Sequence, residues 1–488
     1  MKVTLVPKIE ITRKHPKGMT CATDAEYARI ATEILKKLAK LNITDIPVEG
    51  LKKIAVNVVM YFEDIVSGTG IWNGFTSKVK ELYGRRLPFY DVDENNYFLD
   101  EPNFEDIKLI VWYTMLEVHH GKIGNPENPF LEQMADVAYS VLEDHYETVP
   151  ANDELKNYLC APENFDDFYK MRDALKWLCY GCYLTYIPNI VEHLFAAARE
   201  FAHSTQMYMD PAYYQVESLM AYSQEIGPLQ LLPQQWLGMI LRAAGNEKAA
   251  KDVEAQRVID YQPNKIVAVD DANNWTFEAT DGETFKVLES ELNFPAEECR
   301  DRKVVIGSFV EYRGEWHLNG GCAWSESLDD YNSIHDDKIG HDKLHPVYDK
   351  LVKENGGSRL FYFADTAALK KFVMENMPFD DEVKKNFSLP EGHEKIALFV
   401  PEDYGDFQIF PDGALCIKDE RNPYYNEKWA RNQSLNFVLS VGHDMRTYLI
   451  SNGMLPDATI NSSKGVERGN EIVQQNFDFI TKAVSSRL

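Results

Sequence analysis

The clearest hydrophobic pattern lies in the middle of the chain, over residues 257–325. A short apolar run is followed by Trp275, Phe277 and Ala279, which alternate with polar residues at the period of two that is typical of a half-buried strand. An Asp-Gly pair at 281–282 favours a tight hairpin turn, and a second apolar run follows it. The segment therefore predicts a small β-barrel of the SH3-like or OB-like kind, because closure removes the exposed edges of a short sheet.

Residues 1–256 show the spacing of amphipathic helices. Ile30, Ile34 and Leu38 recur at helical intervals, and similar stripes follow along this half of the chain. Further helices are expected at 129–148, 188–207, 211–222, 233–244 and 247–257. This pattern predicts an all-α domain of about ten helices, compatible with an irregular bundle.

After the barrel the pattern changes twice. Residues 326–358 form an acidic connector rich in His and Asp that ends in a helix, and residues 359–488 mix strand and helix patterns. Strands are expected at 359–364, 396–400 and 407–410. A Pro-Asp-Gly turn at 411–413 would fold another strand back onto the last of these. The last part is predicted to be an α+β domain with a small antiparallel sheet, and the whole chain a multidomain α+β protein.

Composition narrows the class of protein. The chain has 488 residues and 44% hydrophobic content, enough for about three ordinary domains. Its formal charge of -26 repels phosphate backbones, so no nucleic-acid partner is expected. No apolar stretch is long enough for a membrane span, and seven scattered cysteines favour reduced thiols. We expect a soluble, cytoplasmic protein without a membrane partner.

The acidic connector contains one candidate site for a divalent metal ion. His335, Asp337, His341 and His345 place imidazoles among carboxylates, which resembles a ligand set for such an ion. Pro346 disfavours the helical conformation at His345, so His341 and His345 are not expected to form a helical pair. A solvated acidic linker explains the same residues, and this interpretation is favoured.

A second candidate is a ferritin-like di-metal site in the helical half. Two pairs have the Glu-x-x-His spacing that places ligands one turn apart, Glu117 with His120 and Glu200 with His203. Glu63 and Glu143 would supply the single carboxylates from two other helices. However, Glu200 and His203 lie off the apolar stripe of their helix, whereas such ligands must point inward. Chance spacing is the favoured explanation.

The aromatic residues of the barrel segment suggest an interaction surface. Trp275, Tyr312, Trp316 and His317 would offer a peptide or oligonucleotide ligand a stacking face wherever they are exposed. A barrel this small also has to fill its interior with large side chains, so a core role is favoured. Cys179 and Cys182 continue the apolar stripe of a helix, so buried structural thiols are also the favoured interpretation of this pair.

Three classes of function remain open: an intracellular interaction or scaffold protein, a metal-dependent enzyme, and a small-ligand binding protein. The first is favoured, because three different cores without a visible nucleophile or phosphate loop look like an assembly of modules. A protein partner is therefore possible, and no cofactor is evident beyond a divalent metal ion. A hydrolase with residues drawn from distant positions would show the same pattern, so the sequence does not decide whether the protein is an enzyme.

Overall fold

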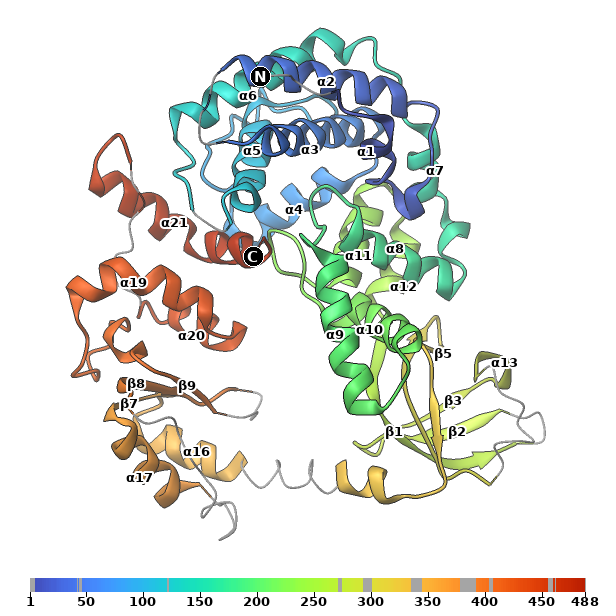
Figure 1. Ribbon diagram of the computed structural model, residues 1–488, viewed down its shortest axis with the longest axis vertical. Coiled ribbons are helices and arrows are strands. Elements are labelled where there is room, and N and C mark those ends of the chain that lie inside the picture. Colours follow the sequence, from blue (N-terminus) through green and yellow to red (C-terminus); the bar gives the residue numbers. More distant parts are fainter. Residues whose placement is uncertain are drawn as a thin grey trace. The chain divides into compact units, whose positions relative to one another are not determined.

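The computed structural model divides the chain into two compact units. The described residues are 5–41, 43, 46–120, 123–270, 274–292, 301–334, 345–377, 392–402, 407–454, 460 and 462–487. The first unit comprises residues 1–328 together with 482–488, and the second comprises residues 329–481. Figure 1 shows the elements of both units.

The first unit begins with helices and ends in a barrel. Its helices are α1 (Lys8–Thr12), α2 (Asp24–Lys40), α3 (Val48–Ser67), α4 (Ile71–Tyr83), α5 (Phe104–Val118), α6 (Pro129–Tyr146), α7 (Asp153–Cys160), α8 (Phe168–Tyr180), α9 (Ile190–Thr205), α10 (Met209–Ser223), α11 (Pro233–Ala243) and α12 (Glu247–Glu254). Two 3-10 turns, η1 (Pro16–Gly18) and η2 (Pro162–Phe165), lie between them.

Helix α3 is the central element of this helical part. It contacts α2, α5 and α6, and most of its residues are buried on every side, as in a helix that is apolar all round. It ends at Gly68, whose φ of 64° is the left-handed conformation that glycine accepts without steric cost. Among the described residues no single helix is long and apolar enough to cross a membrane, although α3 and α4 pass that test as a pair bent by 92°.

The barrel closes through one long strand. Its strands are β1 (Arg257–Val269), β2 (Trp275–Glu278), β3 (Thr284–Val287), β4 (Val304–Tyr312), β5 (Glu315–Leu318) and β6 (Ala323–Ser325), with α13 (Glu289–Leu292) after β3. The order β1-β2-β3-β5-β4 returns to β1, and β6 adds to β4. Strand β1 reaches both neighbours because a register shift between Ile259 and Gln262 bends it. Phe277, Phe285 and Phe309 fill the interior.

The second unit is a small sheet between helices. Its elements are α16 (His345–Glu354), β7 (Leu360–Asp365), α17 (Thr366–Asn376), β8 (Glu394–Phe399), β9 (Gln408–Phe410), η3 (Gly413–Leu415), α19 (Glu427–Ser440), α20 (His443–Ser451) and α21 (Val466–Ser485), whose last turn belongs to the first unit. The antiparallel order is β7-β8-β9.

The side chains of β8 alternate between two cores. Ile396 and Leu398 pack with α16 and α17, whereas Ala397 and Phe399 pack with α19 and α20. Successive side chains of a strand point to opposite faces of its sheet, so these two cores lie on opposite faces. Helices therefore cover both faces of the sheet (Figure 1).

The predicted fold class is confirmed: a helical N-terminal half, a closed five-stranded barrel in the middle and a C-terminal region with a small antiparallel sheet. The 411–413 turn differs from its prediction, because Asp412 adopts a left-handed φ of 58° and the chain continues into η3 rather than into a strand. The division into segments 1–256, 257–325, 326–358 and 359–488 stays a prediction.

Candidate functional site

The candidate site is a pocket in the helical part of the first unit, bounded by α9, α10, the loop after α10 and the end of α21. Asn189 directly precedes α9, and its left-handed φ of 52° turns the chain out of the preceding segment. Leu194 and Ala198 are buried on this helix, and α9 packs along α10. This packing leaves a cavity of about 360 Å³ beside the two helices.

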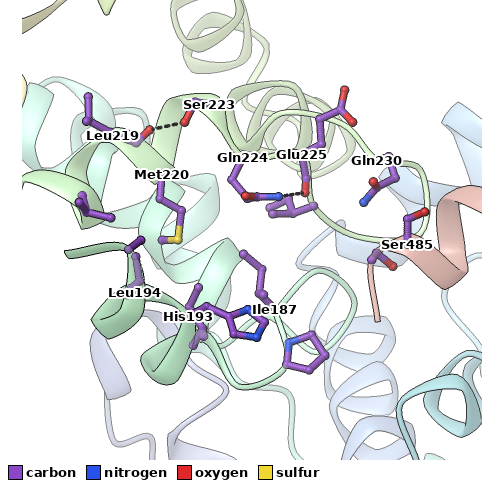
Figure 2. Close-up of a pocket in the computed structure, with 16 residues that line it drawn as sticks. Ile187, His193, Leu194, Leu219, Met220, Ser223, Gln224, Glu225, Gln230 and Ser485 are labelled. Carbon is purple, nitrogen blue, oxygen red and sulfur yellow. Dashed lines mark hydrogen bonds between the residues drawn. The ribbon is translucent and has the colours of Figure 1, made fainter. Parts of the chain in front are cut away.

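Most of the pocket wall is apolar. The apolar lining includes Ile187, Leu194, Val216, Leu219, Met220 and Ile226. The polar lining includes Ser223, Gln224, Glu225, Gln230, Ser485 and Ser486. Figure 2 shows Leu194 and Met220 on one side of the pocket and Ser485 on the other. A largely apolar cavity with a few polar groups is the usual form of a small-molecule site.

Ser485 offers the pocket an unused hydrogen-bonding group. The Ser223 hydroxyl donates to the Leu219 carbonyl at 3.1 Å, and the Gln224 amide donates to the Glu225 carbonyl at 3.0 Å, so both of these groups have partners (Figure 2). The Ser485 hydroxyl is buried and has no hydrogen-bond partner among the described residues. A buried polar atom without a partner costs free energy, and a ligand atom in the pocket would satisfy it.

The end of α21 is anchored by the residues that follow Ser485. The hydroxyls of Ser486 and Tyr113 hydrogen-bond at 2.7 Å. The buried Arg487 guanidinium donates to the Tyr186 carbonyl at 2.9 Å, and its carbon lies 4.0 Å from the centroid of the Tyr113 ring and 4.3 Å from that of Tyr186. These contacts fix the position of Ser485, because a guanidinium between two aromatic faces has little freedom to move.

A second cavity of about 320 Å³ shares Ile187, Pro188 and Ile190 with the first and is lined by several lysines and glutamates. In it Glu117 accepts from Lys53 and Tyr186. Burial alone would raise the pKa of Glu117, but Arg487, Lys53 and Tyr186 together hold it below its ordinary value. Burial, reinforced by the charge of Arg487, lowers the pKa of Lys14 to about 7. The lysines and glutamates that line this second cavity largely compensate one another in charge, so the cavity offers a ligand little net charge.

The residues of the predicted di-metal site do not come together. Glu117 contacts Lys53 and Tyr186, whereas Glu63 is buried in a different cluster with His15 and Asn152. The remaining four residues, His120, Glu143, Glu200 and His203, are exposed. Exposed side chains do not form the inward-facing ligand set that such a site needs.

The other predicted site residues have different outcomes. His335, Asp337 and His341 lie outside the described residues, and His345 is the first residue of α16. Trp275 and Trp316 are buried in the barrel core, and Tyr312 is buried near α8, with its ring centroid 6.5 Å from that of Phe168. The His317 ring stacks on Phe168 with centroids 4.5 Å apart, and its Nδ1 lies 3.1 Å from Glu291. The two tryptophans and the tyrosine are therefore not available at the surface as a stacking face. The metal site in the connector stays a prediction.

The sequence did not point to the pocket that the structure forms. Leu194 and Met220 were expected on helices, but their shared cavity depends on how α9 and α10 pack. Ser485 comes from a segment more than 250 residues away along the chain. The apolar residues Val191 and Phe195 of α9 are exposed, but neither lines this pocket, so they were no signal for it.

Comparison with known proteins identifies one family. The model of the family described as "Protein of unknown function (DUF3843)" matches residues 5–285 and 316–485. No curated protein and no solved structure matches the chain. The matched residues include the helices and the end of α21 that build the pocket.

Proposed function

We propose that this chain, which belongs to the DUF3843 family, binds a small uncharged amphipathic molecule in the pocket between α9, α10 and the end of α21. The observation that carries the proposal is the buried Ser485 hydroxyl, which has no hydrogen-bond partner among the described residues and lines an otherwise largely apolar cavity. The apolar wall would hold the body of the ligand, and Ser485 would hydrogen-bond its polar group.

The charges around the pocket favour an uncharged ligand. Glu225 is the only carboxylate among the described lining residues, and no lysine or arginine is among them. An anionic group would therefore meet a carboxylate with no lysine or arginine to compensate it, and with His193 as the one basic group of the described lining, in a chain whose net charge is -26. The cavity volume of about 360 Å³ lies near the lower end of the range for small-molecule sites, so the ligand is of metabolite size.

A fluorescence titration with the neutral probe N-phenyl-1-naphthylamine tests this function, because its emission rises in apolar surroundings. We expect saturable binding to one site per chain. Ala197 lines the pocket, so Ala197→Trp fills the cavity and abolishes the signal. Ala196 is its exposed neighbour on α9 and is not among the lining residues, so Ala196→Trp leaves binding unchanged. Equal binding by both variants, or no saturable binding to the native protein, contradicts the proposal.

We also propose that this binding takes place in the cytoplasm. Cys21, Cys160, Cys179, Cys182 and Cys416 are free thiols, and such thiols persist in a reducing compartment. The interaction or scaffold role and its protein partner stay predictions.

A further inference from the structure

A buried cluster of metal-ligating side chains lies at the start of α2, away from the ligand pocket. His15, Cys21 and Asp24 come from the short segment between α1 and the first turn of α2, and each is at most 1% exposed. The Nδ1 of His15, the Sγ of Cys21 and a carboxylate oxygen of Asp24 all lie within 4.8 Å of one another. Imidazole, thiolate and carboxylate are the three side-chain types that bind Zn²⁺.

The two separations that involve His15 match the edges of a zinc tetrahedron. Nδ1 of His15 lies 3.4 Å from Oδ1 of Asp24 and 3.6 Å from Sγ of Cys21. Ordinary Zn–N, Zn–O and Zn–S bond lengths at tetrahedral angles give about 3.4 Å between nitrogen and oxygen and about 3.6 Å between nitrogen and sulfur. Nδ1 of His15 is thus spaced from both other donors as it would be around one ion.

The partners of His15 leave the correct nitrogen facing the cluster. Its Nε2 lies 2.7 Å from Oε2 of the buried Glu63, whose Oε1 accepts from the Asn152 side chain at 2.8 Å. A carboxylate that accepts from Nε2–H directs Nδ1 toward the cluster, as is usual for histidines bound to zinc. An ion there would replace the Nδ1 proton that the Met19 carbonyl accepts at 3.2 Å. Glu63 and Asn152 would therefore orient the ligand without touching the metal.

Asp24 supplies the second observation. Its Oδ2 accepts from the Cys21 backbone amide at 3.1 Å and from the Thr12 hydroxyl at 2.9 Å, and lies 3.6 Å from Nζ of Lys8. Its Oδ1 is buried and accepts no hydrogen bond from the described residues. This oxygen lies 3.4 Å from Nδ1 of His15, and a cation between the two atoms would satisfy it.

We propose that His15 Nδ1, Cys21 Sγ and Asp24 Oδ1 bind one Zn²⁺ ion. The Met19 carbonyl oxygen, 3.2 Å from Nδ1, offers a fourth donor from the same segment. The site is closed and buried, so its role is structural: it ties the segment before α2 to α3 through Glu63. The ion and the two anionic ligands, thiolate and carboxylate, compensate one another in charge, which makes their burial tolerable.

Cobalt substitution tests the site, since a thiolate bound to Co²⁺ gives a charge-transfer band in the near ultraviolet. The purified protein, stripped with a chelator and titrated with Co²⁺, is expected to bind one equivalent with this band. Cys21→Ser loses the band, and Asp24→Asn weakens binding at least tenfold. Cys179→Ser is the matched control, because Cys179 is also a fully buried thiol of the first unit, and it keeps the band.

The competing explanation is a metal-free cluster in which a charged His15 lies between Glu63 and Asp24. In that case Cys21→Ser would change thermal stability alone, which is why the spectroscopic signal is decisive. Folded, stripped protein that binds no Co²⁺, or a band that persists in Cys21→Ser, would overturn the zinc site. Neither result bears on the probe titration, since none of the three ligands lines the pocket.

Discussion

Asp106 is a buried carboxylate surrounded by hydrogen-bond donors. The Tyr61 hydroxyl donates to Oδ2 at 2.7 Å, and the Tyr97 hydroxyl donates to Oδ1 at 2.9 Å. These bonds favour the charged form, but burial outweighs them and raises the pKa of Asp106 to about 7. An unfolded Asp titrates near about 3.9. At pH values between about 3.9 and about 7, the folded state therefore keeps a proton on Asp106 that the unfolded state has released. The stability that this proton contributes is fully present below about pH 3.9 and is lost as the pH rises through about 7.

Replacing Asp106 with Asn removes this titration. We expect the free energy of unfolding of the native protein to fall relative to Asp106→Asn between about pH 5 and pH 7, by up to about 1.4 kcal/mol per pH unit. Urea unfolding at a series of pH values measures the difference. Asp210→Asn, at an exposed position of α10, serves as the control. A difference between native protein and Asp106→Asn that stays constant with pH would contradict the assignment.

Ser485 carries the predicted hydrogen bond to the ligand. Ser485→Ala is expected to weaken binding of N-phenyl-1-naphthylamine about fivefold, since one neutral hydrogen bond contributes about 1 kcal/mol. Ser485→Thr retains the hydroxyl and most of the affinity. Ser204→Ala on α9 is the control, because the Ser204 hydroxyl donates to the Phe201 carbonyl of its own helix. Unchanged affinity in Ser485→Ala would show that the hydroxyl does not meet the probe.

At the scale of elements, Asp64 joins α3 to α4. Its carboxylate accepts from the backbone amides of Ile71 and Trp72 at 3.1 and 2.7 Å, in the first turn of α4, and from the Tyr183 hydroxyl at 2.9 Å. One buried side chain therefore satisfies helix-terminal amides and holds a distant segment against them.

Asp64→Ala should destabilise the protein strongly. It removes a helix cap and leaves buried donors without a partner, so we expect a loss of about 3 kcal/mol in the free energy of unfolding. Urea unfolding measures this loss. Asp210→Ala, in the exposed first turn of α10, should cost under about 1 kcal/mol. A loss in Asp64→Ala no larger than in Asp210→Ala would refute the role of this cap.

The elements themselves were largely predictable, because their signals are local. The alternation of Trp275, Phe277 and Ala279 indicated a strand face and the Asp-Gly pair a hairpin, and the structure pairs β2 with β3 around that turn. The 411–413 turn was not predictable in the same way. Gly413 packs against Phe410 and Phe437, so its conformation depends on contacts with α19, which lies far from the turn in sequence.

The pocket and the zinc cluster could not be predicted from local patterns. Ser485 reaches the pocket only because the end of α21 docks beside Tyr113 and Tyr186. His15, Cys21 and Asp24 are close in sequence, but His15 depends for its orientation on Glu63 of α3. Glu-x-x-His spacing was the stronger signal in the sequence, yet the structure leaves His120, Glu200 and His203 exposed. Spacing places residues on an element, and only packing decides which way they face.

At the scale of the whole molecule, the net charge of -26 opposes compaction. Raising NaCl from about 0.01 M to about 0.15 M shortens the Debye length from about 30 Å to about 8 Å and screens this repulsion. We expect the midpoint of thermal unfolding to rise by a few degrees, as measured by calorimetry. KCl should act equally, since the effect is one of ionic strength. A midpoint that falls with added salt would mean that attractive ion pairs outweigh the excess of acids.

The central claim is that α9, α10 and the end of α21 enclose a ligand site. The most direct measurement is the electron density of the protein crystallised with N-phenyl-1-naphthylamine. We predict density for the probe between Met220 and Leu194 on one side and Ser485 on the other, with its amine within hydrogen-bond distance of the Ser485 hydroxyl. Saturating probe that leaves this cavity without density, or that is ordered only elsewhere on the chain, would contradict the proposed function.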